Sequence, residues 1–250
     1  MVESSAKYLQ DKPAVVRKRV GAQVLLLQSD FSEDAENHVF DPSGWRLSEP
    51  VGSGRGANWY VGTGEQSFVL RHFRRGGAIA RLLGDKYWFR SEDSTRSFAE
   101  FNLLLKMHRS GLPVPEPVAA GYIKFGPWYR AQLLTRRIPC AQSWSVELST
   151  DSGSRFWEDV GRAVAKVHNA LVDHADLNAH NVMTDDTGQV FIIDFDKSTE
   201  RDSLAGGWRQ SNLSRLHRSL NKILPDQQSL VDAGWRQLIS AYKSELQSAS

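Results

Sequence analysis

Three oxygen-bearing side chains near position 180 have the types and spacing that suit a metal ion. Asp176 and Asn181 lie five residues apart in His174-Ala-Asp-Leu-Asn-Ala-His-Asn181, and Asp194 follows the apolar run Val190-Phe-Ile-Ile193. Carboxylate and amide oxygens bind a hard cation such as Mg²⁺, which also prefers waters and substrate phosphates. A base beside two such ligands supplies the positioning and charge neutralisation on which phosphoryl transfer depends. The alternative interpretation is ordinary turn carboxylates around a hairpin, and the full spacing favours the first.

The elements that must position these residues change character along the chain. Residues 20–28, 59–62 and 66–71 have the apolar patterns of strands and are separated by glycine-rich turns. A helix with Ser94 as its cap is predicted to end at Gly111. Two more strands are predicted at 120–124 and 129–134. The first part of the chain is therefore predicted to be a small, largely antiparallel sheet with one helix.

The second part is predicted to be mainly helical. Apolar residues recur at helical spacing between 156 and 171, and two further helical stretches follow at about 207–223 and 226–246. A short hairpin is predicted from residues 182–183 and 190–193. Residues 134–139 are the expected connection between the sheet and the helices, so the chemistry is expected between a β-rich part and a helical part.

The motif His-x-Asp-x-x-x-x-Asn, followed by a hydrophobic strand and an aspartate, resembles the catalytic and metal motifs of the protein-kinase-like superfamily. That resemblance implies an α+β, two-lobe fold. Residues 1–138 would form an N-terminal β-rich nucleotide-binding lobe, and residues 139–250 a mainly helical catalytic lobe. It also implies that Asp176 orients the attacking hydroxyl and accepts its proton, while Asn181 and Asp194 bind the Mg²⁺ of ATP.

The chain departs from the usual protein-kinase pattern at two positions. Asn178 stands where protein kinases usually have a lysine, and Asp194-Phe-Asp196 lacks the usual third glycine. Both departures favour a small-molecule or lipid-linked acceptor over a regulated protein kinase. His174 is expected to brace the loop rather than to transfer protons.

The first half offers possible nucleotide contacts. Gly52, Gly54 and Gly56 would let backbone amides approach phosphates, although a simple β turn explains them equally well. Arg71 ends a strand where the superfamily places its phosphate-binding lysine, and it keeps the positive charge in a planar fork. Glu100 on the next helix is the expected ion-pair partner. Solvated surface charge is the alternative interpretation of both residues.

Several further stretches are similar to the bacterial 3-deoxy-D-manno-octulosonic acid (Kdo) kinase family. They form an ordered set between about residues 50 and 200. Besides the 174–181 motif, they are Val69-Leu-Arg-His-Phe-Arg-Arg-Gly-Gly77, Tyr87-Trp-Phe89, Thr95-Arg-Ser97, Pro113-Val-Pro-Glu-Pro117, Tyr129-Arg130 and Ile193-Asp-Phe-Asp-Lys197. This resemblance implies ATP-dependent phosphorylation of the 4-hydroxyl of Kdo on Kdo-lipid IVA, a lipid A precursor, during lipopolysaccharide core assembly. The enzyme would lie peripherally on the cytoplasmic face of the inner membrane.

Composition is consistent with an ordinary globular protein of 250 residues, 40% hydrophobic and 24% charged, with a net charge of +2. No signal-peptide or membrane-spanning pattern is found, so a soluble or peripheral protein is expected. Cys140 is the single cysteine, which excludes an internal disulfide, and it is interpreted as a small buried residue. The basic and aromatic segment 71–90 suits an anionic or membrane-surface partner.

Three other functions compete with this interpretation. An aminoglycoside- or choline-type phosphotransferase shares the loop motif, but its cationic substrates call for acidic pockets, whereas segment 71–90 is basic. A pseudokinase scaffold would have the fold without the chemistry, and the intact Asp176, Asn181 and Asp194 argue against it. A nucleic-acid-binding module is not expected, because no RNA or DNA motif accompanies the arginines.

Overall fold

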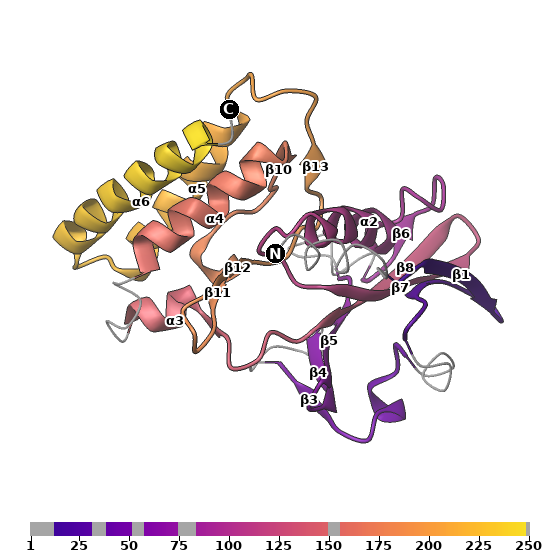
Figure 1. The fold of residues 1–250 in the computed structure, drawn as a ribbon. Helices are drawn as coiled ribbons and strands as arrows, with labels where there is room; N and C mark the ends of the chain where they lie inside the picture. The colour runs from indigo at the N-terminus through magenta and orange to yellow at the C-terminus, as the bar shows by residue number, and fades with distance from the viewer. Residues whose placement is uncertain (1–12, 32–38, 52–57, 75–83, 150–155, 249–250) are drawn as a thin grey trace, which may run out of the picture. The chain divides into compact units, whose positions relative to one another are not determined.

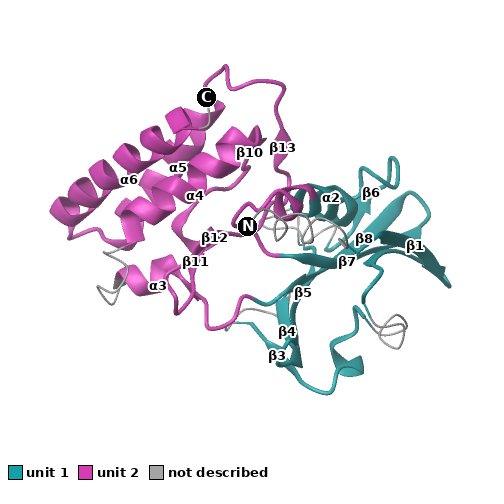
Figure 2. Cartoon of the chain, in the orientation of Figure 1, with its two compact units in different colours: residues 1–105, 116–137 teal, residues 106–115, 138–250 magenta. Residues whose placement is uncertain are grey.

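The structure is a computed structural model that describes residues 13–31, 39–51, 58–74, 84–149 and 156–248. The chain divides into two compact units (Figure 2). Unit 1 comprises residues 1–105 and 116–137, and unit 2 comprises residues 106–115 and 138–250. The segment 106–115, which the sequence analysis assigned to the N-terminal lobe, thus groups with the helical unit. The roles predicted for the two lobes stay predictions.

Unit 1 is built on one antiparallel sheet in the order β1-β2-β7-β8-β5-β4-β3, with β6 paired to β8 (Figure 1). The strands are β1 (Val15–Val20), β2 (Gln23–Gln28), β3 (Ser48–Pro50), β4 (Asn58–Thr63), β5 (Gln66–His72), β6 (Tyr87–Trp88), β7 (Pro117–Phe125) and β8 (Trp128–Arg136). Residues 20–28 were predicted as a strand, and residues 23–28 form β2. Val20 belongs instead to β1, and the hairpin turn between the two strands contains Gly21, whose φ is +59°. The extra strand, β1, is rich in charge, which protects an edge strand from pairing with other chains.

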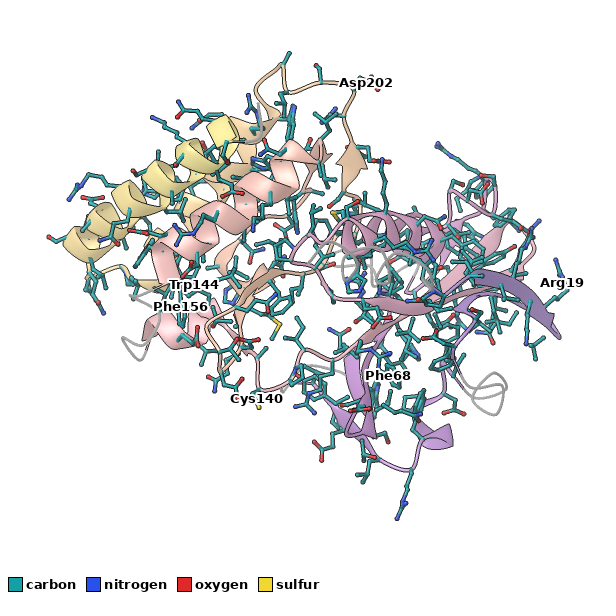
Figure 3. All side chains as sticks on the ribbon, viewed as in Figure 1. Arg19, Phe68, Cys140, Trp144, Phe156 and Asp202 are labelled. Carbon is teal, nitrogen blue, oxygen red and sulfur yellow. The ribbon has the colours of Figure 1, made fainter. Side chains whose placement is uncertain are left out.

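One face of this sheet carries the helix α2 (Arg96–Arg109). Phe98 and Phe101 of α2 are buried, and the Ser97 hydroxyl donates to the Gly121 carbonyl at 2.8 Å. The predicted cap is wrong in detail: α2 begins at Arg96, and the Ser94 hydroxyl bonds Ser91 instead. Much of the remaining core comes from alternate strand residues, including Leu25, Leu27, Val61, Phe68 (Figure 3), Leu70, Val118 and Leu134.

Unit 2 contains four α-helices among its described residues, three of which were predicted. They are α3 (Trp144–Ser149), α4 (Trp157–Asn169), α5 (Trp208–Ile223) and α6 (Gln228–Ser248). Short antiparallel strands complete it: β9 (Gln142–Ser143), β10 (Val172–Asp173), β11 (Val182–Thr184), β12 (Val190–Ile192) and β13 (Thr199–Glu200). The predicted hairpin is β11–β12. Within the described ranges, no helix is both long and apolar enough to cross a bilayer.

Cys140 corrects one prediction. Its side chain is exposed rather than buried (Figure 3), and its φ is +53°. The residue lies just after the point where the chain leaves unit 1. A position in a connecting segment explains the exposure, because such segments run over the surface.

Helices α4 and α6 approach each other through two glycines. A Cβ at Gly161 would lie 2.3 Å from the Leu238 carbonyl oxygen, and a Cβ at Gly234 would lie 2.1 Å from the Trp157 indole. Neither contact leaves room for a methyl group. The close packing of these helices therefore depends on the absence of side chains at both positions.

Gly234→Ala is expected to lower the free energy of unfolding by about 1–3 kcal/mol, because overpacking outweighs the better helix propensity of alanine. Urea denaturation measures the change. Lys243→Ala, on an exposed position of α6, is the control and should stay within about 0.5 kcal/mol of the wild type. A Gly234→Ala protein more stable than the wild type would show that propensity dominates and that the helices move apart easily.

Candidate active site

Short strands position the three candidate site residues of unit 2. Asp176 and Asn181 lie on the loop between β10 and β11, and Asp194 follows β12 after one residue. The loop ends in a 3-10 helix formed by Ala179–Asn181. The Ile193 amide donates to the Asn181 carbonyl at 2.9 Å, so the pairing of β11 with β12 brings Asp194 next to this loop.

The backbone of Asp176 is held from both sides. Its amide donates to His174 Nδ1 at 3.1 Å. Its carbonyl oxygen accepts hydrogen bonds from Asn178 Nδ2 at 2.9 Å and from Asn181 Nδ2 at 3.0 Å. The side chain itself is exposed, and no described residue forms a hydrogen bond or ion pair with its carboxylate. The loop thus fixes the residue while leaving the carboxylate open to a substrate.

His174 braces this loop, as the sequence analysis expects. The imidazole is buried, and because Nδ1 accepts from the Asp176 amide, Nε2 carries the proton that is donated to the Ile193 carbonyl at 3.0 Å. Burial lowers the pKa of His174, although the bond to Ile193 acts in the opposite direction. Phe195 packs against the ring at 4.6 Å between centroids. A neutral, fully bonded imidazole holds the loop and moves no proton.

Asn181 and Asp194 offer oxygen donors of the kind that Mg²⁺ prefers. Since Asn181 Nδ2 donates to the Asp176 carbonyl, the atom of this amide that a cation can use is Oδ1. Asp194 has a φ of +61°, a backbone strain for a non-glycine residue that is typical of functional sites. In the described part of the chain, no three or more His, Cys, Asp or Glu side chains gather into a metal site. The donors present fit a Mg²⁺ ion that completes its coordination with waters and substrate phosphates.

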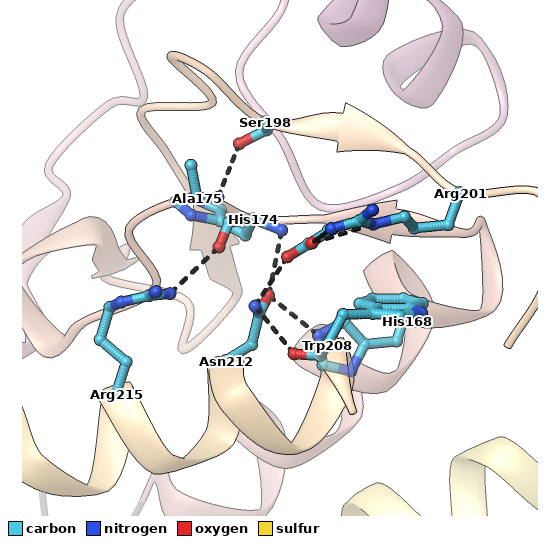
Figure 4. A network of polar contacts seen from close by, with 9 residues as sticks. His168, His174, Ala175, Ser198, Arg201, Trp208, Asn212 and Arg215 are labelled. Atoms are coloured by element: carbon cyan, nitrogen blue, oxygen red, sulfur yellow. Dashed lines mark hydrogen bonds and ion pairs between the residues drawn. The ribbon is translucent and has the colours of Figure 1, made fainter. Parts of the chain in front are cut away.

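A polar network centred on Asn212 of α5 anchors the start of the loop (Figure 4). Asn212 Oδ1 accepts from the His174 amide at 3.0 Å. Its Nδ2 donates to Asp173 Oδ1 at 2.8 Å and to the Trp208 carbonyl at 3.1 Å. Arg201 bonds the second Asp173 oxygen at 2.5 Å. Burial alone would raise the pKa of Asp173, but the bonds from Arg201 and Asn212 outweigh it and the pKa lies below its usual value.

Three hydroxyl or guanidinium groups extend this anchoring along the loop. Ser198 Oγ accepts from the Ala175 amide at 3.1 Å, and Arg215 Nη1 donates to the His174 carbonyl at 3.4 Å (Figure 4). Ser219 Oγ accepts from the Ala179 amide at 3.0 Å. Sequence reasoning missed these residues and Asn212. One signal was present for Asn212, which interrupts the buried row Trp208, Leu216 and Leu220 at four-residue spacing.

His168 of α4 joins the same network and is buried. Its Nδ1 lies 2.8 Å from the Tyr242 hydroxyl, and its Nε2 lies 3.4 Å from Asn212 Oδ1. Burial lowers the pKa of His168 to about 4. The imidazole is therefore neutral in the folded protein at pH values where an exposed histidine would already be charged.

This shift predicts a loss of stability in acid. The unfolded chain binds a proton at His168 near pH 6.5 and the folded chain only near pH 4, so stability declines as the pH falls through that window. Between pH 7.5 and pH 5 the loss from this residue is about 2 kcal/mol. Urea denaturation at both pH values measures it. His168→Gln should reduce the pH dependence by about that amount, and an unchanged dependence would contradict the assignment.

Arg71 and Glu100 form the predicted ion pair in unit 1. Arg71 lies on β5 and Glu100 on α2, and Arg71 Nη2 bonds Glu100 Oε2. Their side chains are 18% and 3% exposed, so the alternative of two solvated surface charges is excluded. The Arg71 guanidinium also lies 4.5 Å from the Phe73 ring centroid. Gly52, Gly54 and Gly56 lie outside the described residues.

Glu100→Gln is expected to lower the free energy of unfolding by about 3 kcal/mol, because it removes the buried negative charge that the Arg71 guanidinium contacts. Urea denaturation checks this. The control is Glu158→Gln, which breaks an exposed contact with Arg162 and should cost less than about 1 kcal/mol. Equal effects of the two substitutions would show that the Arg71 pair is no stronger than a surface pair.

Comparisons with known proteins show which family this chain belongs to. The model of the Lipopolysaccharide kinase (Kdo/WaaP) family matches residues 45–242. A protein named 3-deoxy-D-manno-octulosonic acid kinase from Vibrio vulnificus (strain YJ016) is 39% identical over 83% of this chain and 89% of its own length. Proteins of the same name from Stenotrophomonas maltophilia (strain K279a) and Xanthomonas campestris pv. campestris (strain B100) are 41% and 39% identical. The Stenotrophomonas alignment covers 83% of this chain and 84% of that protein, and the Xanthomonas alignment covers 91% of this chain and 92% of that protein.

Among solved structures, a glucosamine kinase aligns with 98% of this chain and 85% of its own, at 13% identity and a TM-score of 0.47. The β-rich N-terminal unit and the mainly helical C-terminal unit confirm the predicted α+β fold class. The family model covers most of the chain, and the named relatives exceed one third identity over more than four fifths of it. The predicted kinship is therefore confirmed, and the chain belongs to the Lipopolysaccharide kinase (Kdo/WaaP) family.

Proposed function

We propose that this chain is a Kdo kinase, which transfers the γ-phosphoryl group of ATP to the 4-hydroxyl of Kdo on Kdo-lipid IVA in lipopolysaccharide core biosynthesis. The observation that carries the proposal is the Asp176 carboxylate, which is exposed and without a described partner on a loop whose backbone is fixed on both sides. Family membership supplies the class of reaction and of acceptor.

Asp176 would accept a hydrogen bond from the attacking 4-hydroxyl and take its proton as the new bond to phosphorus forms. Asn181 Oδ1 and the Asp194 carboxylate would hold the magnesium ion. When bound, Mg²⁺ neutralises charge on the transferring phosphoryl group. His174, Asn178 and Asn181 keep the base in place, so the reaction requires little rearrangement of the loop.

In unit 1, Arg71 would contribute its guanidinium to the nucleotide phosphates, since a planar fork suits phosphate oxygens. Glu100 would orient that fork through the buried ion pair. The backbone amides around Gly52, Gly54 and Gly56 would approach the same phosphates, as a glycine-rich loop does. These roles rest on the buried pair and on the kinship with a kinase family.

We also propose that the protein acts peripherally on the cytoplasmic face of the inner membrane. Kdo-lipid IVA carries acyl chains and phosphates, so it stays in a bilayer, and the enzyme must reach it there. ATP is found in the cytoplasm, so the enzyme would act on the cytoplasmic face of the membrane.

The test incubates the purified protein with magnesium ATP and Kdo-lipid IVA and follows the lipid by mass spectrometry. One added phosphate on the Kdo 4-position, absent with Asp176→Ala, is the expected result. Parallel reactions contain an aminoglycoside or choline as the acceptor. Phosphate on either of these instead of the lipid would overturn the proposal in favour of the small-molecule phosphotransferases, and ATP binding without any transfer would favour a pseudokinase.

A further inference from the structure

Trp88 is the most exposed of the large hydrophobic residues in the described part of the chain, at 59%. It lies on the two-residue strand β6 and is the register partner of Trp128, where β8 begins. The two indoles meet edge to face with centroids 5.4 Å apart. Phe125, at the end of β7, is the register partner of Trp128 on its other side. Three aromatic side chains thus gather near the tip of the β7–β8 hairpin.

Packing within unit 1 does not account for the exposed indole. Side chains alternate between the two faces of a strand, and in β6 it is Tyr87 that points inward. Tyr87 is buried, and its ring lies 5.6 Å from that of Tyr129. Trp88 points to the opposite face, where it adds little to the core. A large exposed aromatic side chain of this kind marks an interaction surface.

Cations surround this aromatic group. Lys86 Nζ lies 5.9 Å and the Arg130 guanidinium 5.4 Å from the centroid of Phe125. Arg130 also bonds Asp85 at 2.9 Å. We call Lys86, Trp88, Phe125, Trp128 and Arg130 the hairpin surface.

More positive charge lies at the same end of the sheet. Lys124 and Arg90 are exposed, and they lie one residue before Phe125 and two residues after Trp88 in the chain. Val20, at the end of the edge strand β1, pairs with Gln23 of β2, and Gln23 pairs with Ile123 of β7. The end of β1 therefore lies at the same end of the sheet. Arg19 of this strand points away from the sheet (Figure 3). Acidic residues lie among these cations as well, because Asp85 bonds Arg130 and Asp93 lies near Tyr122 together with Arg19. The lysines and arginines named here outnumber them.

We propose that the hairpin surface docks this protein on an anionic lipid bilayer. Indoles favour the boundary between water and hydrocarbon, where one side of the ring is apolar and the N–H remains wet. Lysine and arginine beside them attract anionic headgroups, and this charge complementarity selects a bilayer over a neutral partner. The proposal deepens the proposed function, because it names the surface that would bring the enzyme to a lipid-linked acceptor.

This surface differs from the one that the sequence indicated. Segment 71–90 supplies Lys86 and Trp88, but Phe125, Trp128 and Arg130 come from the hairpin 40 residues later. Arg71, counted in that segment, is committed to the buried pair with Glu100 and does not belong to the surface.

Vesicle sedimentation tests the docking without ATP or any Kdo compound. The wild type should bind vesicles of phosphatidylethanolamine and phosphatidylglycerol, release at high salt, and bind pure phosphatidylcholine weakly. Trp88→Ser combined with Lys86→Gln should lower the partition coefficient tenfold or more. Leu47→Ser and Val146→Ser, at residues that are both 53% exposed elsewhere, are the matched controls and should bind as the wild type does. The proposal would be overturned if the wild type did not bind anionic vesicles, or if the Trp88→Ser, Lys86→Gln variant bound them as well as the wild type does.

Two further measurements distinguish membrane docking from the proposed kinase function and from self-association. With Kdo-lipid IVA dispersed in detergent the variant should retain wild-type activity, and with the lipid in vesicles it should lose activity. Vesicle binding by a protein that phosphorylates neither preparation would leave the docking intact and reject the proposed function. Sedimentation velocity reveals a competing use: a wild-type dimer that Trp88→Ser converts to a monomer, with vesicle binding unchanged, would assign the surface to self-association and reject docking.

Discussion

Asp176→Asn is expected to lower kcat a hundredfold or more while leaving the fold and the affinity for ATP near those of the wild type. The substitution keeps the size of the side chain and removes its ability to take a proton, and a positioned base contributes rates of this order. Its structural cost is small, because the loop is held through the backbone amide and carbonyl of Asp176 and the carboxylate has no described partner. Initial rates at saturating magnesium ATP, with the melting temperature and ATP affinity recorded alongside, give the result.

Asp186→Asn is the matched control. Asp186 is exposed on the turn between β11 and β12, so its loss should leave kcat within about twofold of the wild type. Near-normal turnover of Asp176→Asn would remove this residue from its role as the base. A loss of turnover accompanied by a large fall in melting temperature would instead assign it a structural role.

Asp194→Asn is expected to lower kcat by about 100-fold or more and to raise the Mg²⁺ concentration needed for half-maximal rate. The substitution replaces a charged oxygen ligand with a neutral one, and removing one electrostatic stabiliser of a transition state costs rates of this order. The backbone should keep its conformation, since asparagine tolerates the left-handed region in which residue 194 lies at φ +61°. Rates measured across a Mg²⁺ titration at fixed ATP provide the test.

Asp202→Asn changes an exposed carboxylate elsewhere in unit 2 and should leave the Mg²⁺ titration unchanged. If Asp194→Asn lowers the rate but keeps the wild-type Mg²⁺ midpoint, Asp194 does not bind the ion and acts on the loop by another route. A normal rate together with a normal midpoint would reject the metal assignment for this residue altogether.

The loop that carries Asp176 and Asn181 was predictable because its signal is local. Asp176 and Asn181 are separated by a spacing that the chain itself displays, and the apolar residues before Asp194 mark the strand that presents it. The pairing of Arg71 with Glu100 was also predictable, from a strand followed by a helix. Strong periodicity likewise identified α2, α4, α5 and α6.

The features that sequence reasoning missed depend on contacts between distant segments. The sequence of β1 is too rich in charge to be recognised as a strand, and it forms one because it pairs with β2. Helix α3, with six residues, is too short to show periodicity. Asn212 acquires its role only when α5 lies against the loop, 38 residues before it. Trp88 could not be distinguished from a core residue, because its exposure depends on which face of β6 meets β8. Tertiary contacts, rather than local preference, decide each of these cases.

The anchoring of the Asp176 loop also determines when, during synthesis, this loop can reach its folded conformation. The loop is synthesised before Ile193, which receives the His174 proton, and before Asn212, which receives the His174 amide. A nascent chain that ends ahead of α5 therefore contains every residue of the candidate site motifs, and Ile193 as well, but it lacks Asn212 and Ser219, which accept from the His174 and Ala179 amides. The loop therefore reaches its folded conformation late in synthesis, when the C-terminal helices emerge and pack.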